Sequence, residues 1–262
     1  MFSLYRVNTV TLRYAQKLFR DPGRIINIFY WPFFDVIIYG YMGIWAEQES
    51  ASGLGVALLS GAILSHIVLR ANSDIAFNVV EEFWSSNLVN LFSSPLQFQE
   101  WILGLVLLAF MMFCIIVAFI CTITYLFYGF NLLSIGLLFI PIVLNLFFFG
   151  ISIGFLSTSL LFYYGIRMQE IIFIIGWVFD PFSGAYYPID VLPFWMRTIA
   201  HLLPLSYIFD TLRSVIKNGV YEWRLLITGS FINLFYLGVT ILLLQFLFRK
   251  SLEGGLVSLS ED

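Results

Sequence analysis

Charged and metal-binding residues are scarce in this chain. Asp, Glu, Lys and Arg make up 11% of its 262 residues, whereas soluble proteins carry roughly a quarter. Cys114 and Cys121 lie seven residues apart in one apolar run, so they share a helix face, and we interpret them as free thiols that pack as small hydrophobic residues. The two histidines, His66 and His201, are far apart in the sequence. No metal-binding spacing is formed, and no metal site is expected.

The sequence also lacks the short motifs of common catalytic sites. It contains no GxxxxGK[ST] loop for nucleotide phosphates, no HExxH zinc motif and no GxSxG nucleophile turn. The chain is therefore predicted not to be an enzyme and to hold no cofactor of its own, so we expect any energy source to lie in a partner. No basic patch indicates nucleic-acid binding, and the net charge of −3 identifies no class of partner.

Long hydrophobic runs take the place of the missing polar residues. Hydrophobic side chains make up 60% of the chain, which is typical of an integral membrane protein. Because a bilayer core needs about 20 apolar helical residues, we predict an all-α membrane protein with six transmembrane helices. They are expected at about Ile25 to Ala46, from Leu54, at Trp101 to Tyr128, at Leu132 to Tyr164, from Gln169, and at about Leu225 to Phe248.

No large soluble domain, internal repeat or cleavable signal peptide is evident. The first apolar run begins near Ile25, after a basic segment much longer than the charged region of a signal peptide. We therefore expect the N-terminus to be retained and residues 1–262 to form a single transmembrane domain.

Residues 3–20 are predicted to form a basic amphipathic helix on the membrane surface. At about 100° per residue, the apolar side is formed by Leu4, Val7, Thr11, Tyr14 and Leu18, and the basic side by Arg6, Arg13, Lys17 and Arg20. A solvated helix with an ordinary core-facing side is the alternative. The sequence DPG at 21–23 then turns the chain.

The distribution of Lys and Arg predicts that both termini are cytoplasmic. With six crossings, the inside holds Arg6, Arg13, Lys17, Arg20, Arg24, Arg167, Arg249 and Lys250, and the outside holds Arg197, Arg213, Lys217 and Arg224, with Arg70 left out. The segment between the second and third helices is then cytoplasmic, although it contains no Lys or Arg.

That segment has the acidic and aromatic sequence VEEFWSSNLVNLFSSP at residues 80–95. Its large apolar residues recur at helical spacing and Pro95 ends the helix, so residues 80–94 are predicted to form a short amphipathic helix. Such a helix can lie in the lipid interface, shield the bundle, or dock in a groove of a soluble partner. Its acidic residues favour the partner, because an anionic leaflet repels carboxylates. The candidate contact residues are Glu81, Glu82, Phe83, Trp84, Leu88, Leu91, Phe92 and Pro95.

The segment from Ile171 to Lys217 is too polar and too rich in proline for an ordinary crossing. The apolar run before Asp180 has only nine residues, and several prolines follow it. We predict two short re-entrant helices over 189–217 that dip into the outer leaflet and return, with their non-helical backbone buried in protein or facing water. A large exterior loop is the alternative.

Several polar residues fall within the predicted membrane helices. His66, Arg70 and Asp74 follow one another at four-residue intervals, which allows Arg70 to pair with Asp74. Asp35 lies midway along the first span and should face the bundle interior or a water-filled passage. These residues indicate either an ion or proton relay or structural pairing. Gly150 and Gly154 form a GxxxG pair that permits close helix contact.

Three stretches of sequence are typical of one known family. They are NLFSSPLQFQEWILG at 90–104, SGAYYPIDVLPFW at 183–195 and HLLPLSYIFDTLRSVI at 201–216. With the order of helices, they resemble the permease subunits of type 2 ATP-binding-cassette exporters over nearly the whole chain. The matching positions in the later stretches are Ser183, Gly184, Tyr187, Pro188, Leu192, Pro193, Trp195, Pro204, Tyr207, Asp210 and Arg213, together with Ser94 and Pro95 in the first.

The resemblance implies that residues 80–94 are a coupling helix in a cleft of a separate ATPase subunit, which would bind ATP and Mg. It also implies a dimer of permeases in the cytoplasmic membrane, and re-entrant helices over the exit. The transport path would be lined partly by the first, second and fifth spans, and would serve an amphiphilic, lipid or lipid-linked glycan cargo. The alternative is an ion-coupled secondary transporter or a channel that uses Asp35 and the Arg70/Asp74 pair.

Overall fold

The structure, a computed structural model, describes residues 2–49 and 54–254, and every regular element in these ranges is a helix. The α-helices are α1 (Leu4–Arg20), α2 (Pro22–Glu49), α3 (Leu54–Trp84), α4 (Leu88–Ser93), α5 (Phe98–Tyr128), α6 (Phe139–Tyr164), α7 (Gln169–Val178), α8 (Phe194–Leu202), α9 (Pro204–Asn218) and α10 (Trp223–Gly254). Short 3-10 helices are η1 (Leu132–Leu138), η2 (Ile166–Met168), η3 (Asp180–Phe182) and η4 (Ile189–Val191).

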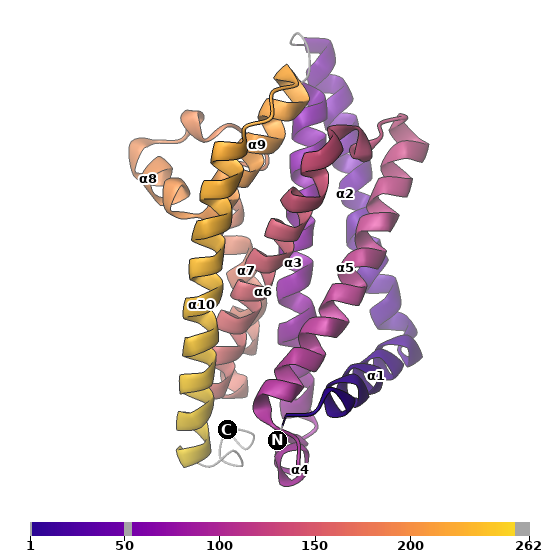
Figure 1. Ribbon diagram of the computed structural model, residues 1–262. Coiled ribbons are helices and arrows are strands. Elements are labelled where there is room, and N and C mark those ends of the chain that lie inside the picture. Colours follow the sequence, from indigo (N-terminus) through magenta and orange to yellow (C-terminus); the bar gives the residue numbers. More distant parts are fainter. Residues whose placement is uncertain (1, 50–53, 255–262) are drawn as a thin grey trace.

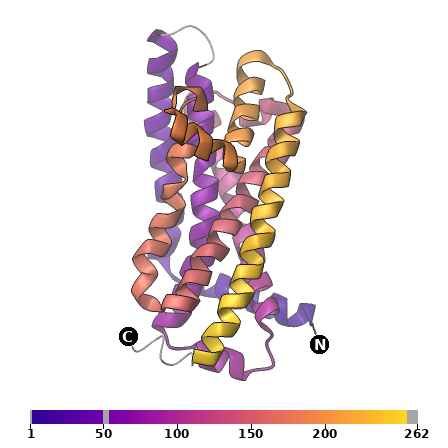
Figure 2. The same ribbon diagram turned by 90° about the vertical axis from the view of Figure 1, so that its left-hand side faces the viewer.

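The long helices run side by side, and α1, α4 and the C-terminal part of α10 lie at one end of the bundle (Figure 1). We call this the α1 end. The helices α8 and α9 lie towards the opposite end (Figures 1 and 2). Helix α3 is the central helix, because 78% of its most apolar 18-residue stretch is buried, whereas the corresponding share is 22% in both α2 and α10. Cys114 and Cys121 on α5 are free thiols, as predicted.

Among the described residues, five helices are long and apolar enough to cross a membrane, rather than the six predicted. They are α2, α3, α5, η1 with α6, and α10. The predicted fifth crossing begins with α7, whose ten residues extend about 15 Å, half of a hydrocarbon core. The chain continues towards the opposite end through η3, η4, α8 and α9 (Figure 2). Pro181, Pro188 and Pro193 are spaced along this passage and prevent one continuous helix.

Helices α3 and α6 cross in close contact at the GxxxG pair. A Cβ atom on Gly150 would lie 2.6 Å from the Cβ of Ala71 and 2.6 Å from the carbonyl oxygen of Val68. At Gly154 the nearest atom would be the Cβ of Ile75, at 3.2 Å. The predicted close approach of a helix to these glycines is therefore confirmed, and it brings the backbones of the two central helices together.

Helix α1 packs against α5 through the face that the sequence predicted to lie on the membrane. Val7, Tyr14 and Leu18 are buried, and the hydroxyl of Thr11 donates a hydrogen bond of 3.1 Å to the carbonyl oxygen of Gly104. A second apolar stripe is exposed, formed by Tyr5, Leu12 and Phe19 at seven-residue intervals. The predicted membrane-facing side of α1 is thus wrong, because the helix has two apolar stripes and tertiary packing buries the other one.

We expect Gly150→Ala to destabilise the fold, because its Cβ overlaps α3 and overpacking of a tight contact costs about 1–3 kcal/mol. The matched control is Gly238→Ala on α10, where a Cβ meets no atom within 4 Å. This control should be neutral or gain up to about 1 kcal/mol from reduced backbone entropy in the unfolded chain. The thermal unfolding midpoint of each purified variant in detergent measures the effect. Equal midpoints for the two variants would contradict the close contact between α3 and α6 at Gly150.

Candidate functional site

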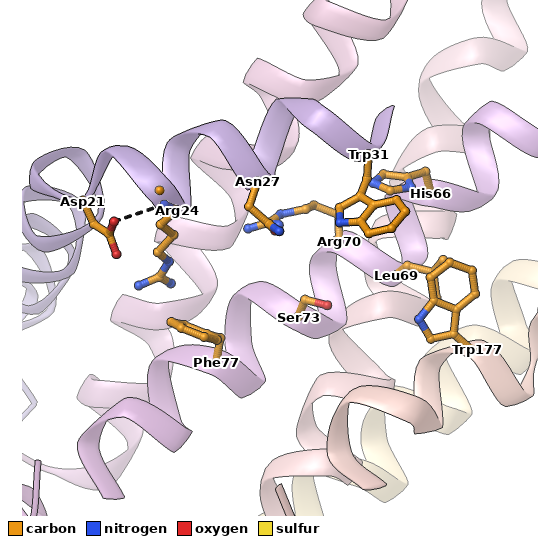
Figure 3. Close-up of a pocket in the computed structure, with 11 residues that line it drawn as sticks. Asp21, Arg24, Asn27, Trp31, His66, Leu69, Arg70, Ser73, Phe77 and Trp177 are labelled. Atoms are coloured by element: carbon orange, nitrogen blue, oxygen red, sulfur yellow. Dashed lines mark hydrogen bonds between the residues drawn. The ribbon is translucent and has the colours of Figure 1, made fainter. Parts of the chain in front are cut away.

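A cavity of about 540 Å³ lies between α2, α3 and α7 (Figure 3). Aromatic and charged side chains share its wall. The residues that line it are Asp21, Gly23, Arg24, Asn27, Trp31, His66, Leu69, Arg70, Ser73, Phe77 and Trp177. Two of the sequence candidates, His66 and Arg70, are among them. The elements around the cavity are those predicted as the first, second and fifth spans.

Arg24, at the first turn of α2, is held against α3 by three contacts. Its guanidinium donates a hydrogen bond of 2.9 Å to the side-chain oxygen of Asn78 and one of 3.3 Å to Glu81. The same group lies 4.5 Å from the centre of the Phe77 ring, a cation–π geometry. This arginine was assigned from the sequence only to the cytoplasmic basic cluster. The structure makes it part of the cavity wall.

The intramembrane candidates form two separate pairs. His66 Nδ1 on α3 lies 2.9 Å from Asp35 Oδ2 on α2, so these two side chains join neighbouring helices. Arg70 forms an ion pair with Asp74 within α3, at the predicted four-residue spacing. Arg70 Nε and Asp74 Oδ2 are buried and have no hydrogen-bond partner among the described residues. Asp35 is thus placed beside a titratable partner that sequence spacing could not identify.

The predicted single helix over 80–94 is divided in the structure. Its first residues, as far as Trp84, are the last turn of α3, and the chain then turns at 85–87 before α4 begins at Leu88. Ser86 has a φ of 50°, a left-handed conformation that interrupts the helix. The side chain of Asn87 supports the turn by donating a hydrogen bond of 2.6 Å to Glu82. Three consecutive polar residues with weak helix propensity, Ser85 to Asn87, explain the break.

The two acidic residues of this segment, Glu81 and Glu82, form ion pairs with basic residues of the same chain. Glu82 is fully buried, lies 2.9 Å from Arg13, and accepts a hydrogen bond of 2.8 Å from the Tyr14 hydroxyl. Glu81 lies 2.9 Å from Lys17 on α1. The inference that these carboxylates point towards a partner is therefore not supported, because α1 neutralises them.

A second buried carboxylate, Glu100, is paired with residues at the N-terminus of the chain at the α1 end. Glu100, at the start of α5, is fully buried and lies 2.9 Å from Arg6. It also accepts a hydrogen bond of 2.6 Å from the backbone N–H of Ser3. Burial and the charge of Glu82 raise the pKa of Tyr14 far above its usual range, so its hydroxyl remains a donor. Glu100 was missed in the sequence, although its position in the first turn of a helix is a known signal for an acidic cap.

Only part of the predicted coupling segment faces outwards. Phe83, Leu88 and Leu91 are buried, and the ring of Phe92 packs 5.5 Å from that of Trp101. Trp84 is 54% exposed and Val89 is 43% exposed. Pro95 and Asn90 are exposed as well. The surface available to another molecule includes these four residues together with the exposed Ser85, Ser86, Ser93 and Ser94. Val89 and Asn90 were not among the contact residues predicted from the sequence.

The stretch 183–195 folds as a tight loop against α3 and α9. Gly184 has a φ of 76°, which favours glycine, and its carbonyl oxygen accepts a hydrogen bond of 2.5 Å from Arg213. Arg213 also lies 2.6 Å from Asp210 on its own helix. The hydroxyl of Ser183 donates a hydrogen bond of 2.7 Å to the backbone of Asp180. Four predicted residues of the stretches 183–195 and 201–216, namely Ser183, Gly184, Asp210 and Arg213, thus make structural contacts.

The remaining candidates of this segment shape the short helices. Pro193 immediately precedes α8, and Pro204 is the first residue of α9, where a missing N–H is tolerated. The hydroxyl of Tyr187 donates a hydrogen bond of 2.7 Å to the carbonyl oxygen of Pro181, and that of Tyr207 donates one of 3.0 Å to His201. Pro188 precedes η4, and Trp195 is 60% exposed.

These features define an all-helical integral membrane protein with a broken fifth passage and a cavity beside it. The chain belongs to the ABC-2 type transporter family, whose model matches residues 5–217. The resemblance to type 2 permease subunits is thereby confirmed. The family is one of membrane permeases, which implies a separate ATPase partner. No individual curated protein matches the chain.

We expect Glu82→Gln to lower the free energy of unfolding by about 1–3 kcal/mol, because it removes the charge that Arg13 and Tyr14 contact in a buried site. The control is Lys17→Gln, since the Lys17 side chain is 40% exposed and an exposed ion pair contributes at most about 1 kcal/mol. Chemical denaturation in detergent, followed by tryptophan fluorescence, compares them. A Glu82→Gln variant as stable as Lys17→Gln would show that the network is not structural.

Proposed function

We propose that this chain is the membrane-spanning subunit of an ATP-driven exporter in the cytoplasmic (inner) membrane, with both termini cytoplasmic. A separate ATPase subunit would bind ATP and Mg, and a second copy of the chain would complete a homodimer. The observation that carries the proposal is the cavity between α2, α3 and α7 in a chain of the ABC-2 family. The α1 end is then the cytoplasmic end.

The composition of the cavity wall supports an amphiphilic cargo, such as a lipid or a lipid-linked glycan. Trp31, Phe77 and Trp177 offer aromatic surface for acyl chains or sugar rings, and Arg24 and Arg70 stand beside them for a polar headgroup. A mostly apolar cleft with a few convergent polar groups is the usual form of a small-molecule site.

The exposed face of α2 supports a dimer around this cavity. Tyr30, Trp31 and Phe34 on α2 are between 40% and 52% exposed, and Trp177 on α7 is 55% exposed. A second copy that covers this aromatic face would close the open side of the cavity. The short helices α8 and α9 would then stand over the exit, which is the role proposed for the re-entrant segment.

The surface formed by Trp84, Val89, Asn90 and Pro95 is the proposed contact with the ATPase. It can transmit movement because Glu82 joins the end of α3 to α1, so that these helices move as one rigid body. ATP would close the ATPase pair and thereby favour one of two permease states. Movement at this surface would reach the cavity through α3, which carries His66 and Arg70.

We expect Trp84→Ala combined with Val89→Asp to reduce co-purification of the ATPase at least tenfold and to lower ATP-dependent transport in parallel. An interface tryptophan commonly contributes about 2 kcal/mol or more. Phe83 is not a suitable test site, because it is buried and its removal would damage the core. The control is Leu137→Asp in η1, which is 75% exposed at the opposite end. If co-purification and transport both persist in the double variant, the coupling assignment fails.

An ion-coupled transporter or channel is the second candidate, favoured by the contact of 2.9 Å between His66 and Asp35. Vesicles that contain this chain without its ATPase distinguish the two. Our proposal expects no cargo transport under a pH gradient alone, and ATP-driven transport that survives Asp35→Asn at a reduced rate. Gradient-driven transport without ATP that Asp35→Asn abolishes would instead establish the ion-coupled mechanism.

A further inference from the structure

A second hollow lies on helices that do not line the proposed transport path. It is a groove of about 350 Å³ between α5, α6 and α10. Gln99 and Gln245 are the polar residues of its lining, and the rest of its wall is apolar, with Val106, Ile151 and Ile241 among them. Its volume falls within the range of about 300–1,000 Å³ that is common for small-ligand sites.

The groove begins at the α1 end and extends into the membrane region. Phe98, at the start of α5, stacks on Phe248 of α10 with 3.8 Å between ring centres, so these two positions are level with each other. Val106 lies about 12 Å further along α5 by helix rise. The glutamines are therefore near the end of the bundle, and the apolar lining continues deeper. This polarity gradient matches one leaflet of a bilayer.

Exposed apolar side chains surround the mouth of the groove. Leu103 and Phe148, on its rim, are 38% and 40% exposed, and Leu107 and Leu242 beside them are 38% and 68% exposed. These residues belong to helices long enough to cross the membrane, so their exposed sides face lipid rather than water. An acyl chain is the molecule that such a hollow admits, because water cannot satisfy its hydrogen bonds there.

A basic residue, Arg249, lies about one helical turn beyond Gln245 of the groove lining. Arg249 follows Gln245 by four residues on α10, so both side chains leave the helix on the same face. Side chains on a helix tilt towards its N-terminus, which directs Arg249 back towards Gln245. Arg249 is exposed, and no ion pair involving it is found within residues 2–49 and 54–254. Its charge complements a lipid phosphate.

We propose that this groove binds one anionic phospholipid of the leaflet at the α1 end. One of its acyl chains lies between α5, α6 and α10, and its headgroup contacts Arg249. The site requires only that the chain spans a membrane, so it stands apart from the proposed transport function. Because α6 packs on α3 at Gly150, the lipid fills the outer side of the central helix pair.

The test counts lipids on the purified full-length chain. The protein is taken from nanodiscs of equal parts phosphatidylglycerol and phosphatidylcholine into mild detergent, and native mass spectrometry measures the lipids that remain. We expect one retained phospholipid per chain, with phosphatidylglycerol favoured about fivefold, the preference that one basic residue near the surface provides.

Matched variants separate the groove from general lipid contact. Val106→Trp and Ile241→Trp fill the groove from facing helices and should each reduce the retained lipid at least tenfold. Leu107→Trp, one residue away on the lipid-facing side, should retain it. Arg249→Gln should abolish the preference for phosphatidylglycerol. Lys250→Gln should preserve that preference, because the Lys250 ammonium lies 4.8 Å from the Tyr163 ring centre instead.

Three outcomes would overturn the proposal. Unchanged lipid retention in both Val106→Trp and Ile241→Trp would show that the groove is not the site. An equal loss in Leu107→Trp would show unspecific annular lipid. A switch from dimer to monomer in the groove variants, without loss of lipid, would identify a second copy of the chain as the occupant. Size-exclusion profiles and helical content verify that each variant is folded.

Discussion

The buried carboxylate of Glu82 is the group on which the arrangement of the α1 end depends. A buried charge needs compensating partners, and Glu82 obtains them from Arg13, Tyr14 and Asn87. These contacts join α1, the last turn of α3 and the start of α4. Trp101 extends the network to α5, because its indole N–H donates a hydrogen bond of 2.9 Å to the Tyr14 hydroxyl. Four elements at this end therefore form one unit.

Helix α3 connects that unit to the rest of the molecule. Its last turn carries Glu82, its middle carries His66 and Arg70 at the cavity, and its other side meets α6 at Gly150. Near its start, the backbone of Ala185 approaches Gly61 so closely that only glycine fits there. One rigid helix thus touches the proposed coupling surface, the cavity and the loop at 183–195. A displacement at the α1 end has a direct structural route to both other regions.

The segment predicted as the fifth span is broken after α7, and the hollows on the two sides of the α3–α6 pair therefore differ in polarity. On one side, the ten-residue α7 leaves a cavity with polar and aromatic walls. On the other, the continuous helices α5 and α10 enclose an apolar groove. The difference follows from Asp180 and the prolines after it, which cannot continue a membrane helix, whereas the long apolar runs of α5 and α10 can.

The amino-acid pattern alone predicted the membrane class, the helical fold, the position of the break and the close contact at Gly150, because hydrophobicity, proline and glycine act locally. It also placed Arg70 beside Asp74, since one helical turn fixes that spacing. It failed where charges pair across the fold: Arg13 and Glu82 are 69 residues apart, so the acidic segment looked available to a partner when α1 already neutralises it. The packed fold was needed to establish which stripe of α1 is buried, where the 80–94 segment turns, and that Asp35 faces His66. Each of these depends on which surfaces pack together, and periodicity along one segment carries no information about its neighbour.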